Sequence, residues 1–127
     1  MPPAKLYIAP SLIPLSGCGL YTSVEIKQGE CFAEYFGPVY TSKELEAKKI
    51  DSLYLFEVSK NHIIDAANVK ECFARCANDA SGFIKINGLC NNTIWNVDES
   101  DNRVFFEAKV DIPAHSEILI DYGKQYW

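Results

Sequence analysis

Short strand-like runs, each broken by turn residues, are the feature that most restricts the fold of this 127-residue chain. Apolar and polar side chains alternate over 53–58, a turn is expected at Lys60-Asn61, and 62–65 continues as the second strand of a β-hairpin. A second hairpin is expected from 92–97 and 103–110. The chain shows no internal repeat. The pattern therefore predicts a mainly β or α+β domain with few short helices, and not a doubly wound α/β fold.

Two short helical segments are expected within this order of strands. Thr41-Ser-Lys-Glu44 fits a capping box, which would open a helix through about Ile50. Residues 68–75 have room for one or two further helical turns. A strand is expected over 31–37, and residues 1–15 are expected to be an irregular lead-in.

Length and composition indicate a single globular domain over residues 1–127. No apolar run approaches the length of a membrane span, and the N-terminus lacks the apolar core of a signal peptide. The formal net charge is −5, and lysine and arginine are not clustered, so direct binding of nucleic acid is not expected. An acidic surface is compatible with a cationic partner such as a lysine-rich peptide, or with a role in solubility alone.

The five cysteines are odd in number and form no Cys-x-x-Cys pair. Cys72 and Cys76 are four residues apart, which suits one face of a helix better than a zinc site. We therefore expect no metal, and reduced thiols in an intracellular protein. A cysteine hydrolase that uses His62 or His115 is not favoured, because His62 adjoins an expected turn, His115 lies in one, and no cysteine has an activating context.

The C-terminal segment, 116–127, contains the first candidate functional side chain. Its apolar run, 118–120, predicts a short buried strand that brings Tyr122 to a turn at Gly123. A tyrosine at such a point either keeps its hydroxyl in a cavity while its ring packs, or caps the strand end. The Gly17-Cys-Gly19 loop is similarly open to two interpretations, a close approach of backbone to a ligand or an ordinary turn.

Five short motifs follow one another along the chain. They are Gly17-Cys-Gly-Leu20, Glu34-Tyr-Phe-Gly37, Tyr54-Leu-Phe56 with Ile64-Asp-Ala66, Ala74-Arg-Cys-Ala-Asn78, and Glu117-Ile-Leu-Ile-Asp-Tyr122. Together they resemble the SET-domain protein lysine methyltransferases, over about Ser16 to Trp127. The resemblance implies a β-clip-like fold of small curled sheets. It also implies a C-terminal pseudoknot that places Asn78 beside Tyr122.

The resemblance also implies an activity, the S-adenosylmethionine-dependent N-methylation of a lysine in a protein, with a histone tail as one candidate substrate and S-adenosylhomocysteine as the product. It implies Tyr122 and Tyr35 as the catalytic pair. The cofactor-binding residues that it implies are Ser16, Gly17, Cys18, Gly19, Leu53, Tyr54, Arg75, Asn78, Asp79 and Tyr126. Within this set, Asn78 would hold the amino-acid end of the cofactor and Arg75 its carboxylate. Tyr54 and Tyr126 fit ordinary core aromatics equally well.

Three features depart from the family pattern. Asp79 stands where the family has His, and a carboxylate close to the sulfonium could act through its charge. Ile120 stands where Phe or Tyr often helps to set the number of methyl groups, and no cysteine-rich segment follows the core. Tyr126 and Trp127, or a partner, would then close the lysine tunnel. A catalytically impaired SET-like peptide-binding or scaffold module is the alternative, and the expected location is the nucleus for a histone substrate and otherwise the cytoplasm.

Overall fold

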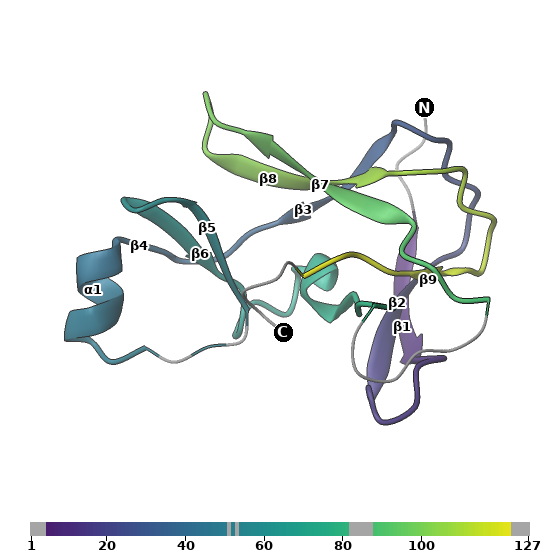
Figure 1. The fold of residues 1–127 in the computed structure, drawn as a ribbon, viewed down its shortest axis with the longest axis horizontal. Coiled ribbons are helices and arrows are strands. Elements are labelled where there is room, and N and C mark those ends of the chain that lie inside the picture. Colours follow the sequence, from purple (N-terminus) through teal and green to yellow (C-terminus); the bar gives the residue numbers. More distant parts are fainter. Residues whose placement is uncertain (1–4, 51, 53, 82–87, 123–127) are drawn as a thin grey trace.

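The computed structural model describes residues 5–50, 52, 54–81 and 88–122. Within these residues the chain forms three small antiparallel sheets of three strands each, with one short α-helix and one 3₁₀ turn (Figure 1). The predicted mainly β architecture with few short helices is therefore confirmed. Each sheet has only three short strands, and the sheets share one main core.

The first sheet has the order β1-β2-β9, formed by β1 (Leu6–Pro10), β2 (Cys18–Thr22) and β9 (Glu117–Ile118). The prediction that residues 1–15 are irregular is wrong for Leu6–Pro10, which pairs with β2 along its full length. Pro10 had favoured an irregular segment. It is tolerated here because β1 is an edge strand, so the backbone N–H that proline lacks is not needed for a hydrogen bond of the sheet.

The second sheet has the order β3-β8-β7, formed by β3 (Cys31–Tyr35), β8 (Arg103–Ala108) and β7 (Thr93–Asp98). The β7–β8 pairing confirms the second predicted hairpin. Val104, Phe106 and Ala108 alternate along β8 and are almost fully buried, so this strand supplies the centre of the sheet's inner face.

The third sheet has the order β4-β6-β5, formed by β4 (Val39–Tyr40), β6 (His62–Asp65) and β5 (Leu55–Ser59). The β5–β6 pairing confirms the first predicted hairpin. Helix α1 (Ser42–Ala47) follows β4, and the predicted capping box is present because the Thr41 hydroxyl and the Glu44 carboxylate each accept the other's backbone N–H. The helix ends at Ala47, earlier than expected.

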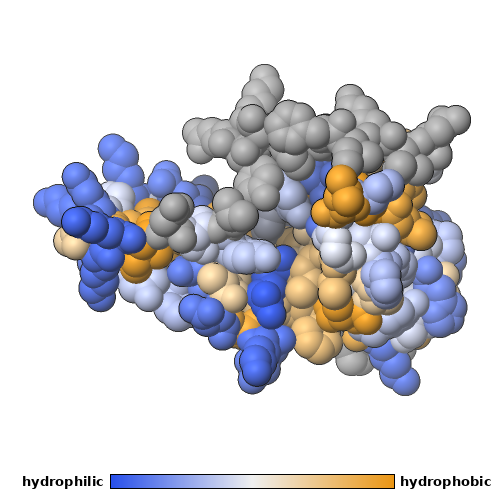
Figure 2. All heavy atoms as spheres, turned by 90° about the horizontal axis from the view of Figure 1, so that it is seen from below, coloured by the Kyte–Doolittle hydropathy of each residue, from blue (hydrophilic) through white to orange (hydrophobic). Residues whose placement is uncertain are grey.

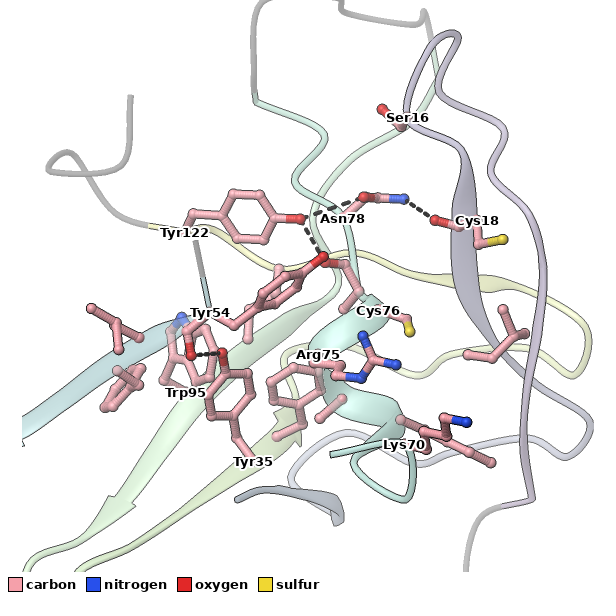
Figure 3. Close-up of a pocket in the computed structure, with 18 residues that line it drawn as sticks. Ser16, Cys18, Tyr35, Tyr54, Lys70, Arg75, Cys76, Asn78, Trp95 and Tyr122 are labelled. Atoms are coloured by element: carbon pink, nitrogen blue, oxygen red, sulfur yellow. Dashed lines mark hydrogen bonds between the residues drawn. The ribbon is translucent and has the colours of Figure 1, made fainter. Parts of the chain in front are cut away.

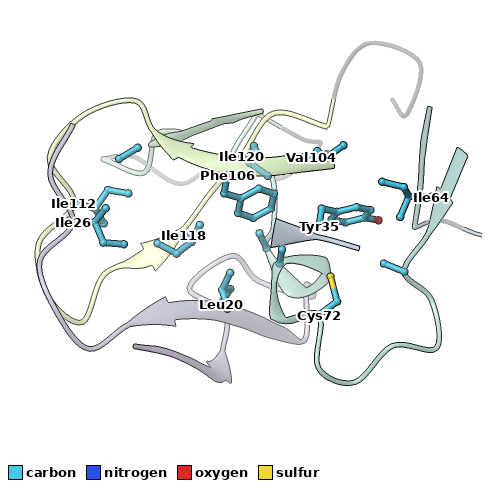
Figure 4. Close-up of a cluster of buried hydrophobic side chains, with 14 residues drawn as sticks. Leu20, Ile26, Tyr35, Ile64, Cys72, Val104, Phe106, Ile112, Ile118 and Ile120 are labelled. Carbon is cyan, nitrogen blue, oxygen red and sulfur yellow. The ribbon is translucent and has the colours of Figure 1, made fainter. Parts of the chain in front are cut away.

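The main core lies where the three sheets meet, around Phe106 (Figure 4). Leu20 from β2, Ile118 from β9 and Ile120 beyond it are at most 1% exposed. The 3₁₀ turn η1 (Phe73–Cys76) covers this core, with Cys72 just before it also fully buried. Because the burial of each side chain removes apolar surface from water, this shared core stabilises the three sheets together.

The C-terminal segment runs between two segments that are distant in sequence. Leu119 forms a parallel bridge with Asn78, and Ile120 forms one with Thr93. The Ile120 N–H donates to the Asn78 carbonyl at 2.9 Å, and the Thr93 N–H donates to the Leu119 carbonyl at 3.1 Å. The predicted juxtaposition of the Asn78 segment with the C-terminal segment is confirmed.

Candidate functional site

A cavity of about 540 Å³ opens where η1, β5, β7, the start of β2 and the C-terminal segment meet (Figure 3). Its lining includes these residues from the predicted site: Ser16, Cys18, Tyr35, Tyr54, Arg75, Asn78 and Tyr122. Gly17, Gly19 and Asp79 are neighbours of lining residues in the chain. Leu53 and Tyr126 lie outside the described residues. The structure therefore brings together side chains from five separate parts of the sequence.

Asn78 lies at the polar end of the cavity. Its Nδ2 donates to the Cys18 carbonyl at 3.0 Å and lies 3.4 Å from the Glu117 carboxylate, while its Oδ1 lies 3.4 Å from the Tyr122 hydroxyl (Figure 3). Two acceptors on one side of the amide fix which way it faces. The acceptor Oδ1 is consequently presented on the Tyr122 side.

Glu117 is a buried carboxylate behind this polar end, and the sequence reasoning did not identify it. The side chain is 3% exposed, and its oxygens accept the Ser11 hydroxyl at 2.7 Å and the Leu12 N–H at 2.9 Å. A Cβ added at Gly19 would collide with the same carboxylate. The second glycine of the Gly-x-Gly loop therefore makes room for Glu117. An acidic residue opening the apolar run at 118–120 was the available signal.

Two tyrosine hydroxyls bond to backbone carbonyls at the cavity. The Tyr122 hydroxyl donates to the Ala77 carbonyl at 2.6 Å, and the Tyr35 hydroxyl donates to the Tyr54 carbonyl at 2.6 Å. Tyr35 is 6% exposed, and this burial raises its pKa well above the ordinary value. Tyr35 therefore stays protonated at neutral pH and serves as a hydrogen-bond donor.

Trp95 completes an aromatic wall that the sequence reasoning missed. Its ring lies 4.6 Å from Phe56, 5.4 Å from Tyr35 and 5.1 Å from Phe106, measured between centroids. Its indole N–H donates to the Asp121 carbonyl at 2.8 Å. No sequence signal separated Trp95 from an ordinary core aromatic, because its role depends on partners from three other strands and from the C-terminal segment.

Arg75 and Lys70 supply positive charge to the cavity wall. The Arg75 Nε donates to the Val69 carbonyl at 3.0 Å, and the guanidinium lies 6.0 Å from the centroid of the Tyr54 ring. This bond and the ring hold the guanidinium in place, so part of its fork can face a bound anion.

Asp79 is 4% exposed, and its carboxylate is engaged with protein groups. Its Oδ1 accepts from the Ser81 N–H at 2.8 Å, the Ser81 hydroxyl at 2.5 Å and the Asn91 amide at 2.9 Å, and its Oδ2 accepts from the Tyr122 N–H at 2.8 Å. Asp79 is not part of the cavity lining. Its side chain therefore organises the loop behind the cavity, and a contact between its backbone and a cofactor stays a prediction.

The face shown in Figure 2 has apolar patches interspersed with hydrophilic ones. Among the described residues, no helix has the length and apolarity that a membrane crossing requires. The same residues contain no cluster of three or more His, Cys, Asp or Glu side chains suited to a metal ion, and the five cysteines are free thiols.

Comparisons with known proteins agree with this geometry. The family model described as the SET domain matches residues 17–123. The chain is 32% identical over 114 residues to the mouse histone-lysine N-methyltransferase NSD3, covering 84% of this chain and 7% of that protein. It is also 32% identical over 114 residues to the human histone-lysine N-methyltransferase, H3 lysine-36 specific, covering 84% of this chain and 4% of that protein.

Solved structures show the same fold. The apo Polycomb Repressive Complex 2 of Chaetomium thermophilum in an autoinhibited state matches with a TM-score of 0.76 at 22% identity, over 96% of this chain and 16% of that one. The same complex in an autoinhibited conformation bound to S-adenosylmethionine matches with a TM-score of 0.72 at 22% identity, over 96% of this chain and 15% of that one.

The chain has three small sheets and a C-terminal segment that runs between two other segments of the chain, and Asn78 and Tyr122 meet at one cavity. This arrangement defines the SET class of fold. The chain belongs to the SET-domain family. It spans less than a tenth of the length of the two relatives described above.

Proposed function

We propose that this chain is an S-adenosylmethionine-dependent protein-lysine N-methyltransferase. The observation that carries the proposal is the Tyr122 hydroxyl, held by the Ala77 carbonyl beside Asn78 at a cavity whose opposite wall is aromatic. Membership of the SET-domain family and the names of the relatives support the same activity. A polar end and an aromatic wall in one cavity suit a reaction between two different ligands.

The polar end fits the amino-acid portion of S-adenosylmethionine. The Cys18 carbonyl and Asn78 Oδ1 are acceptors suited to an ammonium group, and the Arg75 guanidinium is suited to a carboxylate. A volume of about 540 Å³ lies within the range of small-molecule sites. When bound, the cofactor supplies a methyl group already activated on a sulfonium. The protein then mostly provides alignment and electrostatics.

Tyr122 would act at the point of transfer. Its hydroxyl oxygen, the Ala77 carbonyl and Asn78 Oδ1 bring three oxygen atoms close together. Oxygen dipoles in a partly enclosed cavity favour positive charge, which a methyl group between a sulfonium and an amine carries. The Tyr122 oxygen can also accept a hydrogen bond from the lysine amine and orient it.

The aromatic wall would receive the lysine side chain. Tyr35, Phe56 and Trp95 line the cavity together, and their rings can cover the aliphatic stem of a lysine. Such surroundings disfavour the ammonium form and lower the pKa of the lysine amine. After losing its proton to solvent, the neutral amine would attack the methyl carbon, with the C–N bond forming as the C–S bond breaks, so that the positive charge passes from the sulfonium to the methylated amine. Tyr35, which stays protonated, positions the amine and does not serve as its base.

Histone tails are the substrate class that we propose to test first. The net charge of −5 complements a lysine-rich tail, and the relatives are named as histone-lysine methyltransferases. A histone substrate would place the protein in the nucleus.

Calorimetric titration with S-adenosylmethionine tests the cofactor site. We expect micromolar binding that Asn78→Ala weakens at least tenfold. The matched control is Asn96→Ala, which removes an amide bonded to Glu107 on the β7–β8 hairpin, outside the cavity lining. If the wild-type protein does not bind, even with histone peptides present, the proposal is wrong.

Methyl transfer to a panel of histone H3 and H4 peptides tests the reaction. Tyr122→Phe is expected to lower kcat roughly hundredfold while the fold is kept, because one oxygen is lost at the reacting atoms. Tyr21→Phe is the matched control, since its hydroxyl also donates to a backbone carbonyl, that of Pro10, outside the cavity lining. Cofactor binding without transfer to any lysine peptide would instead support the catalytically impaired module.

A further inference from the structure

The Asp79 carboxylate joins the loop after η1 to the C-terminal segment. It is almost completely buried, and it accepts the Tyr122 backbone N–H at 2.8 Å on Oδ2. Three donors from Ser81 and Asn91 meet its Oδ1. A buried carboxylate is costly unless it is well hydrogen-bonded, and hydrogen bonds to a charged acceptor are about twice as strong as neutral ones. The carboxylate is therefore a firm anchor and not an incidental surface group.

Tyr122 is held at both ends by one short segment. Its hydroxyl donates to the Ala77 carbonyl at 2.6 Å and its N–H donates to Asp79. Two residues earlier, the Ile120 N–H donates to the Asn78 carbonyl at 2.9 Å. Residue 77 thus holds the Tyr122 hydroxyl, residue 78 holds the backbone at Ile120, and residue 79 holds the backbone of Tyr122 itself.

We propose that Asp79 is a positioning residue that sets where the Tyr122 hydroxyl lies at the transfer point. The inference rests on the function proposed above. Without the Asp79 anchor, the backbone at Tyr122 is free to move away from the 77–79 segment, and the hydroxyl moves with it. Displacements near 1 Å at reacting groups can lower rates about a hundredfold.

Asp79→Asn separates this anchor from the rest of the network. The Asn oxygen is expected to stay on the side where Ser81 and Asn91 supply three donors. The Asn NH2 group then faces the Tyr122 N–H, so two donors oppose each other where a hydrogen bond existed. The variant keeps the shape of the side chain and replaces the bond from the Tyr122 N–H by a donor–donor contact, while the bonds from Ser81 and Asn91 remain but weaken with the loss of charge.

Ser81→Ala is the matched control, because it removes one donor to Oδ1 and leaves the bond from the Tyr122 N–H. Both variants are compared in melting temperature, cofactor affinity and kcat. We expect Asp79→Asn to lower kcat ten- to hundredfold with cofactor affinity changed less than threefold. Ser81→Ala is expected to lower only the melting temperature. Equal kcat in Asp79→Asn and the wild type would overturn the proposal.

A second readout does not depend on activity. With ¹⁵N-tyrosine labelling the protein gives one backbone amide signal for each of its seven tyrosines, and Tyr122→Phe assigns the relevant one. In the wild type this amide is expected to exchange with solvent at least a hundredfold more slowly than in a free peptide. In Asp79→Asn its proton signal is expected to move upfield and to exchange faster, with no such change in Ser81→Ala.

The two readouts keep the proposals distinguishable. An inactive wild-type protein with a protected Tyr122 amide that Asp79→Asn releases would refute the methyltransferase function and leave the anchor standing. An amide that is unprotected in the wild type, or unchanged in the variant, overturns the anchor whatever the activity. If Asp79→Asn does not fold, an unprotected Tyr122 amide in the wild type still overturns the anchor.

Discussion

Gly19→Ala is expected to destabilise the protein through Glu117, a residue almost 100 positions away in sequence. A Cβ at residue 19 would occupy the place of the Glu117 carboxylate and would lie 3.3 Å from the Ser11 Cα. A carboxylate at the end of a flexible side chain could normally move aside. Here it bonds the Ser11 hydroxyl and the Leu12 N–H and lies near the Asn78 amide, so moving it breaks those contacts.

The expected cost follows from the bonds that must be given up. Hydrogen bonds to a charged group contribute about 1.5–3 kcal/mol each, and partial relaxation recovers some of the loss of two. We therefore expect the free energy of unfolding to fall by about 2–4 kcal/mol. For a chain of this length that corresponds to a decrease in Tm of roughly 8–15 °C. Because Asn78 loses one of its two fixing acceptors, affinity for S-adenosylmethionine should fall as well.

A double-mutant cycle measured by urea unfolding tests the reasoning. In a Glu117→Ala background the carboxylate is gone, so Gly19→Ala should cost less than about 1 kcal/mol, and the two changes should be strongly non-additive. Glu117→Gln keeps the side-chain length and should not relieve the clash. Gly17→Ala is the control: its φ of +66° with open space around it predicts a cost of about 1–2 kcal/mol from backbone strain alone, independent of residue 117. Additive costs for Gly19→Ala and Glu117→Ala would refute the proposed contact.

Three further predictions concern stability. Tyr35→Phe should lower the unfolding free energy by about 1 kcal/mol in urea, because the bond to the Tyr54 carbonyl is lost; unchanged stability would mean that this bond contributes nothing. Hydrogen bonds from Arg103 lower the pKa of the Glu34 carboxyl in the folded protein. The ion pair therefore stabilises the fold above the pKa of the unfolded carboxyl, about 4.3, and this stabilisation is lost as the pH falls through the lower pKa of the folded state. Glu34→Gln should therefore lower Tm at pH 7 but not in strong acid, and an equal effect at both pH values would contradict the pairing. Thr41→Ala should remove the helix cap at about 1 kcal/mol and speed hydrogen exchange in α1 roughly fivefold, whereas unchanged exchange would show that the cap is not needed.

The local elements could be read from sequence because each contains its own signal. The β5–β6 and β7–β8 hairpins carry two alternating strands and the turn between them within about 15 residues. The capping box of α1 needs only four consecutive residues. Strand β1 was not predicted, because its partner β2 supplies the pairing and its own terminal proline indicates irregular chain.

The candidate site also contains residues that the sequence predicted and residues that only the structure revealed. The motif resemblance identified Tyr122, Tyr35, Asn78 and Arg75, and the structure places them around one cavity. Their roles in binding and catalysis stay predictions. Trp95 was missed because nothing local distinguishes a tryptophan in a sheet from an ordinary core aromatic, and Glu117 because an acid that opens an apolar run is a weak signal without its partners. Their significance lies entirely in partners from elsewhere in the chain.

By itself, the sequence determined the short strands, the capped helix and, through five ordered motifs, the family. These depend on side-chain alternation, turn residues and residue identity, all of which act over a few neighbouring positions. Only the tertiary structure decided that Asp79 bonds the Tyr122 N–H and that Gly19 makes room for Glu117. Such contacts join residues 43 and 98 positions apart. Their formation depends on the packing of three small sheets around one shared core, which no local pattern encodes.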